Sequence, residues 1–369
     1  MSNSDELVRP LSAGTEIKRP VQIWLLLGVV MVFIQVVIGG VTRLTDSGLS
    51  ITEWAVIQGT LPPMSTAEWD QAFDLYKMAA KKQYETLHAD MTLSEFKVIY
   101  FWEYFHRLWA RTMGFVFLFP FLYFLYKKWM PGWLLRRLGI VILLASIAAV
   151  FGWVMVASGL NTDDRTWVSA YKLIVHLGVA TSLFGYLFWT WLKAAQPVTA
   201  DSHFKKLKKM GWIIAGVLFV QIIFGGLMAG MRAGLLHPYI SVFVEGDRFW
   251  NALTAIEGVG VNQIVDYEPN SFVKAAVQLL HRGTAWILSA LIILFFINVN
   301  KVNASTRLKR GTMVLVAVLI TQILLGISTV INSIGRIPLV LGAVHQAVAL
   351  LLLICLLFVN YQFKKTKRV

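Results

Sequence analysis

Eight long apolar stretches constrain the fold of this chain more than any other feature of its sequence. Each is long enough to cross the hydrocarbon core of a bilayer as an α-helix, which takes about 20 residues. They lie at residues 21–42, 101–126, 138–160, 170–193, 211–231, 273–299, 312–332 and 338–361. The sequence therefore predicts an all-α integral membrane protein with eight transmembrane helices.

The low charge content agrees with a membrane location. Only 15% of the residues are charged, whereas a water-soluble domain usually carries about 25%. The single cysteine, Cys355, lies inside an apolar stretch, so this sequence can form no intrachain disulfide and no thiolate metal site. These features argue against a soluble globular fold and against cysteine-based redox chemistry.

The basic residues gather on one side of the predicted membrane. The N-terminal segment 1–20, the connections after the second, fourth and sixth spans, and the tail 362–369 share one side and hold 20 basic and four acidic residues. The rest of the chain holds 14 basic and 16 acidic residues. Because basic loops stay in the cytoplasm, we expect an inner-membrane protein with both termini cytoplasmic. The net charge of +14 combines +16 on these five short segments with −2 on the rest of the chain, and this spread argues against a nucleic-acid-binding surface.

The two halves of the chain repeat each other. The pattern Gln-x3-Gly-Gly-x7-Gly-Leu begins at Gln35 and again, with identical spacing, at Gln221. Each half holds four spans, which predicts two pseudo-symmetric four-helix bundles related by an axis along the membrane normal. In the first outer loop, Ser65 and Glu68 form a candidate capping box for a short helix outside the membrane. We expect a cytoplasmic N-terminal segment 1–20, a first bundle 21–193 with a long outer loop 43–100, a basic cytoplasmic linker 194–210, a second bundle 211–361 and a basic tail 362–369.

Four histidines lie inside the predicted spans, where ionisable side chains are costly and usually functional. They are His106, His176, His281 and His345, one in each span that runs inward from the outer side. Their positions place them in one layer, roughly 8–11 Å below the outer boundary at about 1.5 Å per helical residue. The other histidines, His88, His203 and His237, fall in loops, where we expect solvated or loosely bonded rings.

Two imidazoles at matched depth in one bundle could hold the iron of a haem between them. The first bundle supplies His106 and His176, and the second supplies His281 and His345. Three other interpretations fit the same residues: a two-histidine copper or zinc site, a proton or substrate relay in a transporter, and structural hydrogen bonds between helices. The residues alone leave these alternatives open.

The two bundles differ at one position beside the histidines. Glu103 stands three residues before His106, on nearly the same helix face, whereas the matching residue in the second half is Gln278. This difference predicts a reactive site in the first half and an electron-carrying site in the second. The alternative for Glu103 is an interfacial ion pair with Arg107 or Lys97.

Arginines near the outer ends of the spans could bind haem propionates, because guanidinium and carboxylate groups form bidentate hydrogen bonds. Snorkelling to the membrane interface is the other explanation for each of them. The candidates are Arg43, Arg107, Arg165, Arg232, Arg282 and Arg336.

Several motifs together resemble the haem A synthase family, of the mitochondrial and proteobacterial-like type. The most specific is the run from Gly39 to Thr45, and the likeness extends from about residue 21 to 361 with all four histidines in order. The chain lacks the cysteine pair that some bacterial relatives carry in the first outer loop. It also has Ala148 four residues before Gly152, where the related span has Gln322 before Gly326. The further matching motifs are Glu103-x2-His106-Arg107, Ser158-Gly159-Leu160, Tyr171-Lys172-x3-His176-Leu177, His281-Arg282 and Pro338-x6-His345-Gln346.

The resemblance implies an oxidoreductase that converts haem O to haem A for cytochrome oxidase. In such an enzyme the porphyrin C8 methyl group becomes a formyl group through successive hydroxylations that use molecular oxygen. The resemblance also implies a resident haem B on His281 and His345, a substrate haem between His106 and His176, and Glu103 as the essential acid. Its further partners would be an electron donor that the sequence does not identify, membrane lipid and, by pathway adjacency, haem O synthase. The alternative function is a dihaem cytochrome b-type electron-transfer protein that oxidises quinol, and a proton-coupled transporter is a third.

Overall fold

The computed structural model describes residues 17–53, 61–160, 166–196, 199–255 and 259–364. Within these ranges the protein contains helices and no strand, and eight helices are long and apolar enough to cross a membrane. They are α1 (Arg19–Leu44), α4 (Leu93–Tyr126), α5 (Gly132–Ala157), α6 (Ala170–Ala195), α7 (Lys205–Gly230), α10 (Ser271–Asn300), α11 (Thr306–Ile331) and α12 (Leu339–Tyr361). The all-helical fold with eight candidate spans is therefore confirmed.

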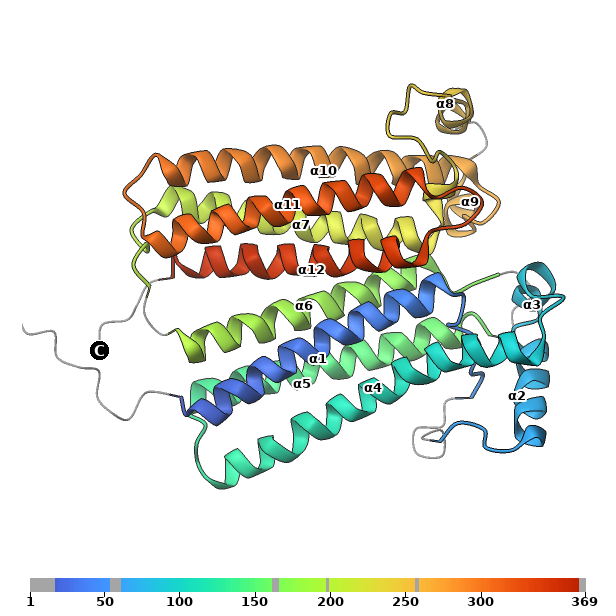
Figure 1. Cartoon of the computed structure of the whole chain (residues 1–369), viewed down its shortest axis with the longest axis horizontal. Helices are drawn as coiled ribbons and strands as arrows, with labels where there is room; N and C mark the ends of the chain where they lie inside the picture. The colour runs from blue at the N-terminus through green and yellow to red at the C-terminus, as the bar shows by residue number, and fades with distance from the viewer. Residues whose placement is uncertain (1–16, 54–60, 161–165, 197–198, 256–258, 365–369) are drawn as a thin grey trace, which may run out of the picture.

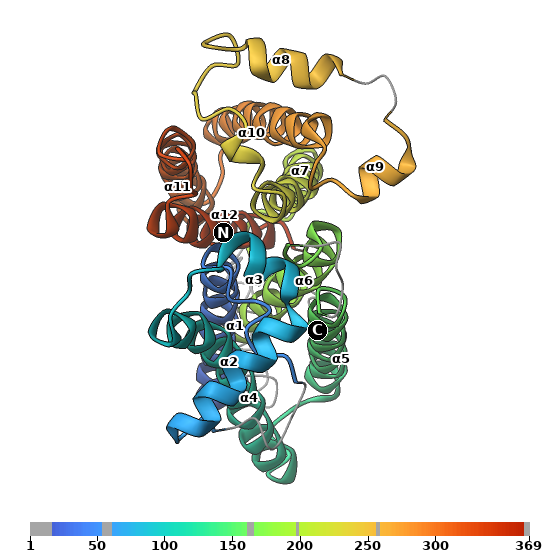
Figure 2. The same cartoon turned by 90° about the vertical axis from the view of Figure 1, so that its right-hand side faces the viewer.

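The long helices run side by side in two groups (Figure 1, Figure 2). In the first group, α1 packs on α4 and α6, and α5 packs on α6. In the second, α7 packs on α10 and α12, and α11 packs on α10 and α12. The groups meet where α1 contacts α12 and where α6 contacts α7 and α12. A continuous apolar core, which includes Val21 of α1 and Leu356 of α12, joins the two groups into one structure.

Several long helices extend past the predicted spans. The helix α4 begins at Leu93 rather than at residue 101, and Thr92 and Glu95 form a capping box at its first turn. The helices α5, α7 and α11 each begin six residues before the predicted apolar stretch. The difference arises because apolar length reports the thickness of the hydrocarbon core, whereas a helix continues into the interface wherever its end groups find partners.

The first outer loop contains two short helices, α2 (Thr66–Ala79) and α3 (Lys81–Leu87), next to the start of α4 (Figure 2). The predicted capping box is confirmed, because Ser65 accepts the backbone N–H of Glu68 at 3.3 Å and the Glu68 carboxylate accepts that of Ser65 at 3.1 Å. Phe73, Tyr76 and Phe96 are buried together beneath these helices. This part of the loop is thus a folded layer with a small core of its own.

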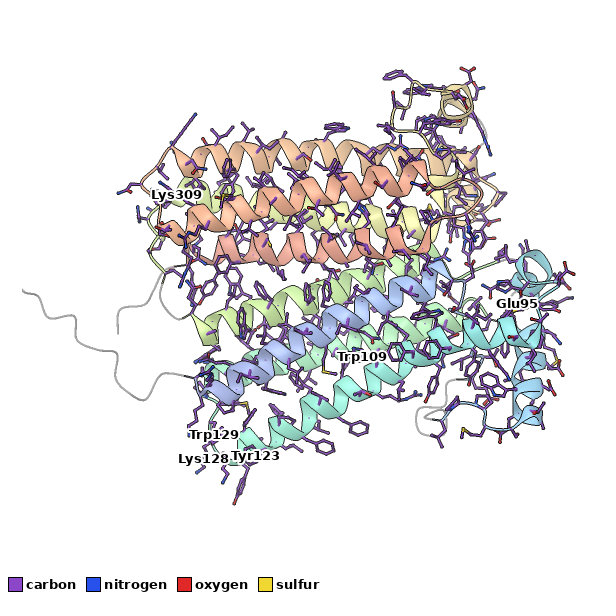
Figure 3. All side chains as sticks on the ribbon, in the orientation of Figure 1. Glu95, Trp109, Tyr123, Lys128, Trp129 and Lys309 are labelled. Atoms are coloured by element: carbon purple, nitrogen blue, oxygen red, sulfur yellow. The ribbon has the colours of Figure 1, made fainter. Side chains whose placement is uncertain are left out.

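The second outer connection contains the short helices η2 (Ala233–Leu235), α8 (Asp247–Thr254) and α9 (Val261–Val265). In Figure 1, α2, α3, α8 and α9 all lie at the right-hand end, whereas α1 begins and α12 ends at the left. Figure 3 shows Lys128 and Lys309 at the left-hand end and Glu95 at the right. We call the right-hand end the outer end. Its orientation in the membrane is a prediction from the charge pattern.

Candidate functional site

The four membrane histidines form two pairs, one in each group of helices. His106 on α4 and His176 on α6 lie within electrostatic range of each other, and so do His281 on α10 and His345 on α12. The helices within a pair do not pack on each other; instead α1 contacts both α4 and α6, and α7 contacts both α10 and α12. Each pair therefore spans the interior of its own bundle.

A glycine on a neighbouring helix makes room for each imidazole. A methyl group on these glycines would lie within 2.9–3.4 Å of the histidine Cε1 atom, at or inside ordinary van der Waals contact. Since the same glycine–histidine contact occurs at all four sites, it is a shared feature of the histidine sites and not a local packing detail of one of them. The pairs are Gly39 with His106, Gly152 with His176, Gly225 with His281 and Gly326 with His345.

The second glycine of each Gly-Gly pair serves the contact between the halves. A side chain on Gly40 would collide with Gln346 of α12, and one on Gly226 would collide with Leu177 of α6. Gln346 and Leu177 each directly follow a membrane histidine. Gly40 and Gly226 thus let a helix of the other half approach the backbone closely.

Three glutamines each contact an imidazole nitrogen. Each glutamine stands four residues before the glycine that lies beside the same imidazole, on the same helix. The Gln35 amide lies 3.2 Å from Nε2 of His106, the Gln221 amide lies 3.2 Å from Nδ1 of His281, and the Gln322 amide lies 3.3 Å from Nε2 of His345. At the fourth site the corresponding residue is Ala148, whose backbone carbonyl lies 2.8 Å from Nδ1 of His176. That contact leaves Nε2 of His176 as the nitrogen with a free lone pair.

The chemistry of these residues fits a haem better than a metal ion bound by side chains alone. Among the described residues, no three His, Cys, Asp or Glu side chains converge. A protein zinc site usually takes three or four side-chain ligands, whereas a haem iron brings four nitrogens of its own and needs only axial ligands. Buried polar atoms of the same sites, Oε1 of Gln35 and of Gln322 and Nδ1 of His345, have no hydrogen-bond partner in the described part of the chain. The glycine cradles and these polar atoms together fit a haem that each histidine pair would hold.

Glu103 lies one turn outward from His106 and is only 3% exposed. Its Oε2 atom accepts hydrogen bonds of 2.8 Å from the Ser50 hydroxyl and from the Ile51 backbone N–H. Its Oε1 atom forms an ion pair of 2.5 Å with Arg107. The ion pair that we considered for Glu103 is therefore confirmed with Arg107, and the carboxylate also fixes the start of the outer loop above the first histidine pair.

The second half repeats this clamp with a neutral amide, Gln278, in place of the carboxylate. The Gln278 amide donates to the His237 carbonyl at 3.1 Å, and Arg282 donates to the same carbonyl at 3.1 Å. His237 is only 1% exposed, so the expectation of a solvated ring is wrong at this position. The ring is buried because the chain after η2 folds back under α8, against Phe249. The equivalent positions 103 and 278 thus both fasten an outer loop, and only the first half places a negative charge there.

The candidate arginines separate into two groups. Arg107 and Arg282 hold loop carbonyls, whereas Arg43, Arg232 and Arg336 line a cavity of about 670 Å³ at the outer end. This cavity lies between the ends of α1 and α7 and the connection from α11 to α12, so it touches both halves. Arg165 falls outside the described residues.

An ion pair joins the two halves beside this cavity. Asp46 binds Arg232 and, at 3.4 Å, Arg43. In the repeat, Asp46 and Arg232 occupy the same position, and both have a left-handed backbone with φ of 56° and 50°. Sequence reasoning missed this contact, although the opposite charges at equivalent repeat positions were its signal. It likewise missed the roles of Gln35, Gln221 and Gln322, which the shared spacing to glycine could have indicated.

Fold and site together define a class: a polytopic helical membrane protein with two pseudo-equivalent histidine pairs suited to haem. The COX15-CtaA family, described as cytochrome oxidase assembly protein, matches residues 22–357. This chain belongs to that family.

Relatives cover nearly the whole chain. A haem A synthase from Flavobacterium psychrophilum is 36% identical over 347 residues, which are 94% of this chain and 99% of the relative. One from Nitrosospira multiformis is 38% identical over 353 residues, or 95% of each protein. One from Caulobacter is 38% identical over 348 residues, or 91% of this chain and 93% of the relative.

Proposed function

We propose that this chain is a haem A synthase, an enzyme of haem A biosynthesis that acts on haem O. Relatives of this name match it over nearly their whole length, and its family is one of cytochrome oxidase assembly. The observation that carries the proposal is the difference between the two sites. Two equivalent histidine pairs lie in equivalent bundles, but a carboxylate, Glu103, stands beside only one of them.

The two halves bind different haems. His106 and His176 hold the substrate haem O, and His281 and His345 hold a resident haem B. When bound, haem B supplies one-electron transfer between an external donor and the first site. The glycines beside all four histidines support this assignment, because they leave room for the fixed imidazole orientation that a histidine bound to iron would need.

Glu103 acts as a fixed negative charge beside the substrate. Ser50, Ile51 and Arg107 already engage both of its oxygens, so the carboxylate cannot swing freely to collect a proton. A held anion can stabilise positive charge that develops on a nearby carbon while the C8 methyl group is oxidised to formyl. The reaction uses molecular oxygen as oxidant and electrons from a donor, with haem O synthase as the neighbouring enzyme that delivers the substrate.

The outer cavity supports binding of propionate groups. Arg43, Arg232 and Arg336 line it together with one acid, Asp46, which leaves the cavity with positive charge. The inner-membrane location and cytoplasmic termini, which the charge pattern predicts, place this cavity and both histidine pairs toward the outer face.

The test compares Glu103→Gln with Glu95→Gln in cells that make haem O. Glu95 lies on the same helix, is exposed, and only caps its first turn. We expect Glu103→Gln protein to keep haem but to accumulate unconverted or partly oxidised substrate, while Glu95→Gln protein makes haem A. Normal haem A production by the Glu103→Gln protein would refute the role of Glu103, and purified wild-type protein that holds haem B alone would favour a quinol-oxidising cytochrome.

A further inference from the structure

The two bundles differ in how completely their helices close around the histidines. In the second bundle every neighbouring pair packs: α7 with α10, α10 with α11, α11 with α12, and α12 with α7. In the first bundle the equivalent pairs pack on three sides, but α4 and α5 make almost no contact with each other. The unclosed side lies between the helix that carries His106 and the helix whose Gly152 supports His176.

The side chains of α5 are small where those of its repeat counterpart α11 fill the bundle. Aligning Gly152 with Gly326 sets Ala145 opposite Leu319 and Ala149 opposite Ile323. Leu319 is 3% exposed and Ile323 packs against the same core, so these positions face inward when a bundle is closed. In α5, Ala145 and Ala149 are exposed.

The neighbouring surface is apolar. Among the eight candidate spans, α4 and α5 are the least buried. Phe119 of α4 and Leu143 of α5 are 63% and 58% exposed. A hydrocarbon chain placed between these helices can therefore pack against apolar side chains and lipid.

The substrate of the proposed reaction has a part that needs such a path. Haem O carries a farnesyl chain on its ring, and haem B does not. A ring held inside a four-helix bundle fills it, so the chain must leave between two helices. In the first bundle one side lacks packing between neighbouring helices, whereas in the second bundle all four sides are packed.

We propose that the farnesyl chain of haem O leaves the first bundle between α4 and α5, against Ala145 and Ala149. The inference rests on the proposed function and adds a subsite to it. The small residues of α5 leave room for a prenylated haem in the first half. In the second half the packing of α10 on α11 leaves no path for such a chain, so that half binds a haem without one.

The test transfers the residues of the second repeat into the first, as Ala145→Leu and Ala149→Ile. The matched control is Ser146→Ile, which makes a similar change at the neighbouring position. Its counterpart Ile320 is 54% exposed, so this position faces outward even in a closed bundle. Purified proteins that retain haem B are titrated with haem O and separately with haem B, and binding to the first half is followed in the Soret band.

We expect the two inward substitutions to weaken haem O binding about tenfold or more, with binding of the chain-free haem within about threefold of wild type. Ser146→Ile should match wild type with both haems. Equal loss of both haems, no loss, or the same loss in Ser146→Ile would overturn the path. A wild-type protein whose first half fails to bind haem O would instead contradict the proposed function. The band of the second-half haem reports folding, and Ala149→Val replaces Ala149→Ile if that band is lost.

Discussion

The glycine beside His345 offers the sharpest quantitative prediction. A methyl group on Gly326 would lie 2.9 Å from Cε1 of His345, about half an ångström inside ordinary contact, which begins at 3.4 Å. Without haem the ring can turn aside, but an imidazole bound to iron cannot. Overpacking of this size costs about 1–3 kcal/mol, which corresponds to roughly 5- to 140-fold weaker binding of haem B.

The assay is the dissociation constant of haem B for Gly326→Ala protein, measured from the visible spectrum. Two graded controls belong to the same bundle: Gly225→Ala would meet His281 at 3.4 Å and should have a smaller effect, and Gly216→Ala would meet no atom within 4 Å. Because alanine favours helix over glycine by about 1 kcal/mol, the haem-free Gly326→Ala protein should unfold no more readily than wild type. Unchanged haem B affinity in Gly326→Ala, or equal losses in Gly326→Ala and Gly216→Ala, would refute the reasoning.

Three further predictions concern the outer end and the topology. Asp46→Asn removes the ion pair with Arg232 between the halves, whose side chains are only 17% and 24% exposed. Thermal unfolding should show that the free energy of unfolding falls by about 1–2 kcal/mol. The losses from Asp46→Asn and Arg232→Gln should be less than additive in the double variant, and full additivity would show that the pair does not interact. Burial lowers the pKa of His88, whose Nδ1 atom lies 2.6 Å from the Tyr76 hydroxyl. As the pH falls below about 6.5, the unfolded chain takes up a proton at His88 before the folded chain does, so the α2–α3 layer should become more sensitive to proteolysis. His88→Gln should flatten that pH dependence. Alkaline phosphatase fused after Lys128 should be inactive and that fused after Met64 active, and the reverse pattern would invert the predicted topology.

The helices and the histidine pairs could be predicted because their signals are local. An apolar stretch of membrane length leaves few other folds, and a histidine inside it is conspicuous. The repeated spacing from Gln35 to Gly39 and from Gln221 to Gly225 also marked the glycines that accommodate imidazoles. The helix starts were less accurate, because the caps at Thr92 and elsewhere lie outside the apolar stretches.

The contacts that shape the two sites could not be predicted because they join distant segments. Glu103 meets Ser50 and Ile51 only after the outer loop folds back onto α4. His237 becomes buried only when α8 packs above it. The near absence of packing between α4 and α5 depends on how the helices tilt, and hydropathy carries no information on tilt.

The haem content of histidine variants tests the central claim most directly. Each protein is purified from cells that make haem O, and its haems are extracted and separated by chromatography. We expect His281→Ala and His345→Ala to lose haem B, and His106→Ala and His176→Ala to keep haem B but lack haem O and haem A. Haem B that survives in both His281→Ala and His345→Ala, or that disappears in His106→Ala, would contradict the division of the two halves into a substrate site and an electron-carrying site.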